Sequence, residues 1–229
     1  MNFFEIIINS FKLIFSLDLK LYEIIILSLK VSLISLFISS ILGLITGFFL
    51  AIKHFHYKSL IIITLNALMG IPPVVVGLIV YFLFANGGPF GVFELLYTPF
   101  TMIVAQSIII YPIVSSLSYE LFNQNWQKFK DDFRAFNIPL VGISLVLIQH
   151  SYFIILTIIL SAFGRAISEV GSVLIVGGNI EHYTRVMTTA ITLQTRMGNL
   201  DYAMALGLVL ILITVFINAL VYIVNVRKN

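Results

Sequence analysis

The sequence predicts an all-α integral membrane protein with about five transmembrane helices. Of its 229 residues, 60% are apolar and 10% are charged, and the mean hydropathy is +1.08. Soluble domains carry about a quarter charged residues, so this composition excludes a cytosolic enzyme. The second observation is the length of the uncharged runs, because roughly 20 apolar residues cross the hydrocarbon core as a helix. Five stretches are long enough: 31–52, 59–93, 95–119, 135–164 and 202–226.

The N-terminal segment 1–20 precedes these spans and differs from them. It is apolar, but Glu5 and Lys12 interrupt it and leave it too short to cross. We expect an interfacial helix here, and the alternative is a sixth span. The membrane domain is expected over 21–226, followed by a short tail, 227–229.

Lysine and arginine alternate between the connections and predict the orientation. Seven lie in the 53–58 loop, the 120–136 loop and the tail with Arg227 and Lys228, against four on the opposite side. The richer side is cytoplasmic by the positive-inside bias. The N-terminus is therefore expected outside and the C-terminus inside.

Glycine and proline interrupt the second and third spans, at Gly70, Pro72, Pro73, Gly77 and Pro112. Such breaks free backbone groups inside the bilayer, which neighbouring helices or a water-lined cavity must satisfy. This is typical of transporters, where broken helices line the path. The alternative is a kink that only improves packing.

The next segment, 120–137, has an aromatic stripe opposite a polar face. At steps of four, three, four and three residues come Phe122, Trp126, Phe129, Phe133 and Phe136. The other face carries Gln127, Lys128, Lys130, Asp131 and Arg134. The pattern predicts a short amphipathic helix on the cytoplasmic side, docked either on lipid or in the groove of a partner.

Residues 162–189 place charged and polar groups in an apolar stretch. Arg165 and Glu169 lie four apart, so they face each other on a helix. Intramembrane charges are usually paired and line a protein interior, which predicts either a pore-side gate or a structural salt bridge. Glycines and Asn179 then allow a turn before Thr184, Arg185, Thr188 and Thr189. Those donors suit a tetrahedral oxyanion, although a plain solvated connection has the same composition.

Several chemistries are not expected of this chain. It has no cysteine and no Gly-Lys pair, so a thiolate site and a phosphate-binding loop are absent. His54 and His56 have no third ligand nearby in sequence, so no metal site is expected. We expect no cofactor in this chain, and any ATP would be used by a partner subunit.

Two motifs resemble the membrane permeases of ABC importers, within the oxyanion family that carries tungstate and molybdate. The first is FGRAISEVGSVLIVGGNI at 163–180 followed by TRVMTTAITLQT at 184–195. Its Ser168-Glu169-Val170-Gly171 differs from the Gly-Glu-Phe-Gly of molybdate permeases, which favours the tungstate branch. The second is Asp131, Asp132, Phe133 and then Asn137, at the place of the family's Glu-Ala-Ala, three residues, Gly.

The resemblance implies a type I, molybdate- and methionine-permease-like fold in a bacterial or archaeal cytoplasmic (inner) membrane. It implies a homodimer with two cytoplasmic ABC ATPase subunits and an extracytoplasmic oxyanion-binding protein, surrounded by lipid and without nucleic acid. The chain itself would be no enzyme. A path or gate would use Arg165, Glu169, Gly171, Pro72 and Pro73, and the oxyanion would contact Asn179, Thr184, Arg185, Thr188 and Thr189. A coupling helix at about 122–137 would reach the ATPase through Trp126, Phe129, Asp131, Asp132, Phe133, Arg134 and Asn137.

The alternatives concern the cargo and the motor. Molybdate, sulfate or phosphate are the other cargoes, because anion choice belongs mostly to the binding protein. A secondary transporter or channel without a motor is the alternative of another class, in which the intramembrane ion pair responds to protons or ions.

Overall fold

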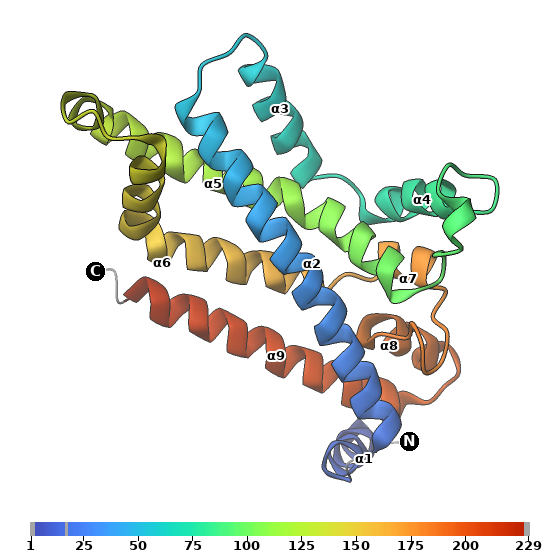
Figure 1. The fold of residues 1–229 in the computed structure, drawn as a ribbon. Helices are drawn as coiled ribbons and strands as arrows, with labels where there is room; N and C mark the ends of the chain where they lie inside the picture. The colour runs from blue at the N-terminus through green and yellow to red at the C-terminus, as the bar shows by residue number, and fades with distance from the viewer. Residues whose placement is uncertain (1–2, 17, 227–229) are drawn as a thin grey trace. The chain divides into compact units, whose positions relative to one another are not determined.

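The computed structural model describes residues 3–16 and 18–226, and every regular element within those residues is helical (Figure 1). The predicted tail, with Arg227 and Lys228, lies outside the described residues. In chain order the helices are α1 Phe3–Phe15, α2 Leu19–Ile52, α3 Lys58–Met69, α4 Pro73–Phe84, the 3-10 turn η1 Gly91–Phe93, α5 Pro99–Ala135, α6 Leu140–Ile167, α7 Gly171–Gly177, α8 Met187–Arg196 and α9 Leu200–Val226.

Four of these helices are long and apolar enough to cross a membrane: α2, α5, α6 and α9. The pair α3 and α4 adds a fifth span if the two are counted together. Each predicted stretch falls on these helices, although α2 begins well before residue 31. Helix α1 has 13 residues, which is roughly 20 Å of helix. That is shorter than the hydrocarbon core, so α1 gives no support to a sixth span.

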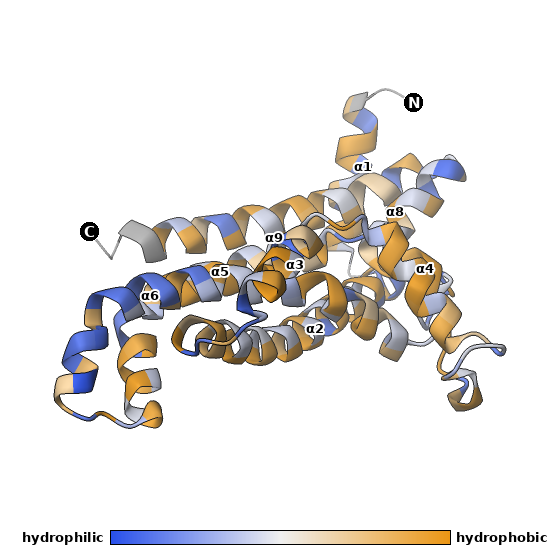
Figure 2. Cartoon of the chain, turned by 90° about the horizontal axis from the view of Figure 1, so that it is seen from above, coloured by the Kyte–Doolittle hydropathy of each residue, from blue (hydrophilic) through white to orange (hydrophobic). Residues whose placement is uncertain are grey.

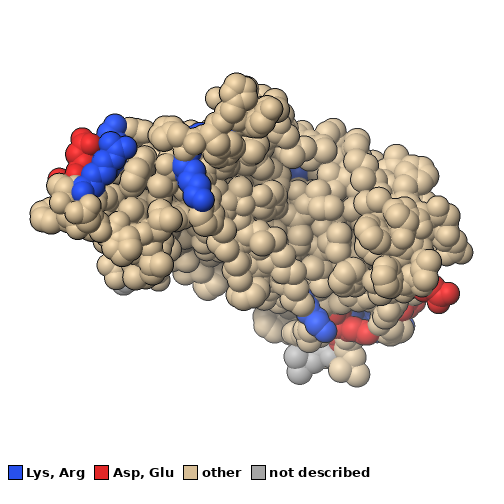
Figure 3. Space-filling view, turned by 45° about the horizontal axis from the view of Figure 1, so that its top comes forward, with Lys and Arg blue, Asp and Glu red and all other residues tan. Residues whose placement is uncertain are grey.

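The surface is that of a multi-pass membrane protein. Figure 2 shows apolar residues along the helices, and large exposed side chains include Phe37, Phe82, Val141 and Leu212. On the face drawn in Figure 3, charged side chains form only a few small groups in a largely uncharged surface. Such a surface would be unfavourable in water but matches lipid tails.

The predicted break in the second span is confirmed, and the one in the third is wrong. Helix α3 ends at Met69 with Gly70 as its C-cap, and Pro73 starts α4, where its missing N–H costs nothing. Gly77 lies inside α4 and Pro112 inside α5, which continues through both neighbouring turns. Pro112 removes one helical hydrogen bond, and the buried Ile110 and Val114 around it hold the helix by packing.

The chain folds into two compact units. Unit 1 comprises Met1–Ser35, Pro72–Gln106 and Gly164–Phe216. Unit 2 comprises Leu36–Ile71, Ser107–Phe163 and Ile217–Asn229. In unit 2, α2 and α5 approach closely at two glycines four residues apart. A Cβ added at Gly43 would lie 2.8 Å from Val114 Cβ, and one at Gly47 would lie 2.7 Å from Ser118 Cβ. Small residues at this spacing are typical of membrane helix pairs.

The predicted coupling helix is not a separate element. Residues 122–135 are the last part of α5, a single helix of 37 residues. No helix-breaking residue separates them from the span, which explains why the helix continues. It ends where Asn137 takes a left-handed conformation with φ of 48°, ahead of Pro139. At 1.5 Å per residue α5 is roughly 55 Å long, so it must extend beyond a hydrocarbon core of about 30 Å.

Candidate functional site

The charged pair of the fourth span lies at a break in the helix, in unit 1. Helix α6 ends at Ile167 and α7 begins at Gly171, so Glu169 follows the helix end instead of facing Arg165 along a continuous helix. Arg165 Nη1 lies 3.5 Å from Glu169 Oε2, with side chains 40% and 4% exposed. The same carboxylate accepts the Ser172 N–H at 3.1 Å. Glu169 therefore satisfies freed backbone at the break, as well as pairing with Arg165.

Helices α4 and α7 pack closely beside this break. A Cβ added at Gly77 of α4 would lie 2.7 Å from Ser172 Cα, and one at Gly171 would lie 2.6 Å from a methyl group of Val74. Val74 immediately follows Pro72 and Pro73 in the chain. The structure therefore brings Pro72, Pro73 and Gly171 of the predicted path into one region of unit 1.

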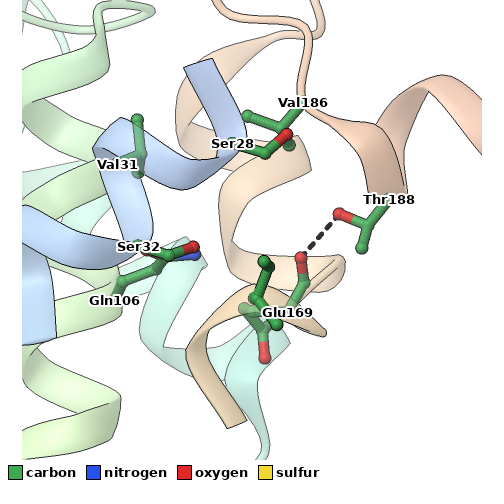
Figure 4. Close-up of a pocket in the computed structure, with 8 residues that line it drawn as sticks. Ser28, Val31, Ser32, Gln106, Glu169, Val186 and Thr188 are labelled. Carbon is green, nitrogen blue, oxygen red and sulfur yellow. Dashed lines mark hydrogen bonds between the residues drawn. The ribbon is translucent and has the colours of Figure 1, made fainter. Parts of the chain in front are cut away.

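A small polar cavity lies next to Glu169 (Figure 4). Its volume is about 10 Å³, the space of about one water molecule. Figure 4 shows Ser28, Val31 and Ser32 reaching it from α2 and Gln106 from α5, with Thr188 donating to the Glu169 backbone oxygen at 2.7 Å. A tetrahedral oxyanion does not fit in this conformation, so Thr188 is not an anion contact as the structure stands.

The serines of α2 and Gln106 are site residues that the sequence interpretation missed. The Ser28 hydroxyl accepts the Met187 N–H at 2.8 Å, which ties α2 to the start of α8. Gln106 is 4% exposed; it donates to the Ala166 carbonyl and accepts from Ser35, both at 3.0 Å. A signal was available, because Ser28, Ser32 and Ser35 follow one helical face in an otherwise apolar span.

Two of the predicted oxyanion-contact threonines have structural roles. Thr184 donates to the Gly177 carbonyl and accepts the Ile180 N–H at 2.9 Å, which closes the turn after α7. Thr189 accepts the Val186 N–H at 3.1 Å and donates to the carbonyl of the same residue, which caps α8. Both are 1% exposed, so neither hydroxyl is available to an external anion.

Arg185 is placed differently, at a pocket of about 130 Å³, more than ten times the volume of the inner cavity. The pocket is also lined by Lys20 and Glu23 of α2 and by Glu181 and His182 of the loop before α8. Arg185 Nη1 lies 3.6 Å from Glu181, and Nη2 donates to the Asn179 carbonyl at 3.4 Å. Among the described residues, Arg185 Nε and Asn179 Oδ1 are buried atoms without a hydrogen-bond partner.

Acidic groups balance the cations of this pocket. Lys20 Nζ lies 3.3 Å from Glu181, and His182 Nδ1 lies 2.7 Å from Glu23. The Lys20 ammonium, with a smaller contribution from Arg185, holds the pKa of the Glu181 carboxyl below its ordinary value. Lys20 and Arg185, the two cations that could meet an incoming anion, are therefore already paired with a carboxylate of the protein, Glu181.

The end of α5, in unit 2, has the predicted two faces, but the aromatic face is not free. Phe122, Trp126 and Phe133 are buried, and the rings of Trp126 and Phe133 stack 5.9 Å apart. Phe129 is half-buried and contacts His150 edge to face at 5.1 Å. The exposed side chains near the end of the helix include Asp131, Asp132, Arg134, Phe136 and Asn137. A partner would meet this second group, because Phe122, Trp126 and Phe133 of the stripe pack inside the chain.

Comparison with known proteins shows similarity along most of the chain. No protein-family model matches it. It is 37% identical over 211 residues to the tungstate uptake system permease protein TupB of Peptoclostridium acidaminophilum, an alignment covering 92% of each chain. It is 40% identical over 198 residues to a probable anion ABC transporter permease protein of Haloferax volcanii, covering 84% of this chain and 85% of that one. The similarity to TupB of Campylobacter jejuni is 37% over 165 residues, covering 72% and 69%.

Proposed function

This chain belongs to the family of ABC transporter permeases for tungstate and related anions, and on that premise we propose that it forms the membrane path of a tungstate importer. The observation that carries the proposal is the 37% identity to a tungstate uptake permease across 92% of both chains. ATP hydrolysis is assigned to a separate subunit. Family membership also removes the basis for a transporter without a motor.

The geometry of unit 1 supports a path beside Glu169. The α6–α7 break and the start of α4 lie together there, and broken helices place polar backbone at membrane depth. The inner cavity of about 10 Å³ would have to widen for an oxyanion to pass. We assign the control of this widening to the Arg165–Glu169 pair, because the pair bridges the α6–α7 break, which would have to move.

Anion contact is assigned to Arg185, with the threonines supporting the loop that holds it. Its side chain is 14% exposed and lines the pocket, and Lys20 lies in the same pocket. Glu181 occupies both cations, so a tungstate ion would displace a carboxylate that remains tethered nearby. Such competition favours brief contact and release, which an importer requires of its permease.

The partners are proposed as a second copy of the chain, two cytoplasmic ATPase subunits and an extracytoplasmic binding protein. The projecting end of α5 is the proposed ATPase contact, through exposed Asp131, Asp132, Arg134 and Asn137. This assignment places the C-terminus inside and the N-terminus outside. The pocket with Arg185 then lies on the outer side, where the binding protein delivers its anion.

ATPase activity in vesicles tests this function. The permease is reconstituted with its ATPase and with binding protein loaded with tungstate, molybdate or sulfate. Tungstate-loaded protein is expected to stimulate most, and Arg185→Gln to reduce uptake about tenfold, the loss of one charge-assisted hydrogen bond. Arg196→Gln, at the exposed end of α8, is the matched control. Stronger stimulation by another anion would overturn the cargo, and an unaffected Arg185→Gln would overturn the contact.

A further inference from the structure

An apolar groove in unit 2 is used by neither the path nor the ATPase contact. Its volume is about 340 Å³, and it lies between the second half of α2, Phe122 of α5 and the start of α6. The side chains that form it include Ile45, Phe48, Phe49, Phe122 and Val141. Ser144 is its one polar member, and its hydroxyl donates to the Val141 carbonyl at 2.8 Å. The groove therefore suits a hydrocarbon ligand.

One end of the groove carries a cation. Lys53 Nζ lies 5.2 Å from the centre of the Phe49 ring, and that ring lines the groove. Lys53 is exposed and directly follows Ile52, the last residue of α2. Helix α2 has 34 residues, roughly 50 Å, so it is longer than the hydrocarbon core, and the charged Lys53 and Lys58 that follow Ile52 mark this end as the one at headgroup depth. The sequence has no acidic residue between Phe49 and Lys58.

From this geometry we propose that the groove binds an anionic phospholipid, with an acyl chain along Phe48 and Phe49 and the headgroup paired with Lys53. Apolar area favours the acyl chain of any lipid, whereas the ammonium favours an anionic headgroup. The charge complementarity selects this occupant over a second copy of the chain, whose corresponding end would present the same lysine. One lysine near the headgroup is expected to give about a fivefold preference for an anionic over a zwitterionic lipid.

The only tryptophan of the chain reports on this groove. Trp126 lies four residues after Phe122 on α5, about 6 Å along the axis. The full-length chain is reconstituted in phosphatidylcholine vesicles in which part of the lipid is replaced by brominated phosphatidylglycerol or by brominated phosphatidylcholine. Brominated phosphatidylglycerol is expected to quench the Trp126 fluorescence to the same extent as brominated phosphatidylcholine at about one-fifth of the mole fraction of that lipid.

Three variants make the test specific. Lys53→Gln should remove the preference, and Ser144→Phe should remove it by filling the groove. Lys128→Gln is the matched control and should preserve the preference. Lys128 Nζ lies 5.3 Å from the Phe129 ring, so it makes the same kind of contact as Lys53 and lies closer in sequence to Trp126. Phe129, however, does not line the groove. Circular dichroism checks that each variant is folded. Equal quenching by the two lipids, no quenching by either, or an unchanged preference in Lys53→Gln would each overturn the proposal.

Discussion

A methyl group at position 77 is expected to force α4 and α7 apart. An ideal Cβ on Gly77 lies 2.7 Å from Ser172 Cα, 3.1 Å from its carbonyl oxygen and 3.3 Å from its Cβ. Two of these atoms belong to the backbone of α7, so no change of side-chain rotamer relieves the contact. Gly77→Ala must therefore displace a helix that begins two residues after Glu169.

The expected magnitude follows from two opposing effects. Overpacking of this kind costs about 1–3 kcal/mol, whereas replacing glycine by alanine within a helix gains about 1 kcal/mol. Gly77→Ala should therefore lower the free energy of unfolding by up to about 2 kcal/mol. Gly207→Ala in α9 is the matched control, because a Cβ there has nothing within 4 Å. The difference between the two variants isolates the contact, at about 1–3 kcal/mol.

Unfolding by dodecyl sulfate titration in mixed micelles, followed by circular dichroism, measures this difference. Transport in vesicles measures whether the displacement reaches the path. Equal stability of Gly77→Ala and Gly207→Ala would refute the close α4–α7 packing. Gly77→Ala with lower stability and normal transport would keep the packing and remove its place beside the path.

Three other predictions follow from charged and aromatic residues. Glu169→Gln should lower the free energy of unfolding by about 1–3 kcal/mol, because a buried carboxylate loses its charge-assisted hydrogen bonds; no change in the same titration would contradict this. Phe133→Ala should lower the free energy of unfolding by about 3–5 kcal/mol, because a buried ring is lost. Arg134→Glu, at an exposed position, should leave that free energy unchanged and weaken co-purification with the ATPase. A stable Phe133→Ala, or normal co-purification of Arg134→Glu, would exclude the proposed contact face. Lys20 lowers the pKa of Glu181, so this pair stabilises the fold above the ordinary carboxyl pKa and the stabilisation is lost as pH falls through the lowered value. Thermal unfolding across acidic pH should show that loss, and Lys20→Gln should remove it; identical profiles would argue against the pair.

Some features of the fold follow from local chemistry alone, so the sequence predicted them. The Gly70-Ile71-Pro72-Pro73 break depends on the missing N–H of proline and needs no distant partner. Pro112 is also a proline, but it lies within α5 and does not end the helix. Its buried neighbours hold the helix around it, and their packing could not be read from the local sequence. The aromatic stripe at 122–136 was visible as a helical face, but the burial of Phe122, Trp126 and Phe133 within it was not.

The sequence by itself determined the membrane class, the apolar spans and the family, because these depend on composition and on contiguous motifs such as 163–180. Only the tertiary structure decided which polar residues remain available. Thr184 and Thr189 bond to their own turns and Thr188 bonds to Glu169, whereas Arg185 lines an open pocket. The physical reason is that a hydrogen-bond donor can be used once by a near neighbour or left for a ligand, and its surroundings are set by segments far apart in the sequence.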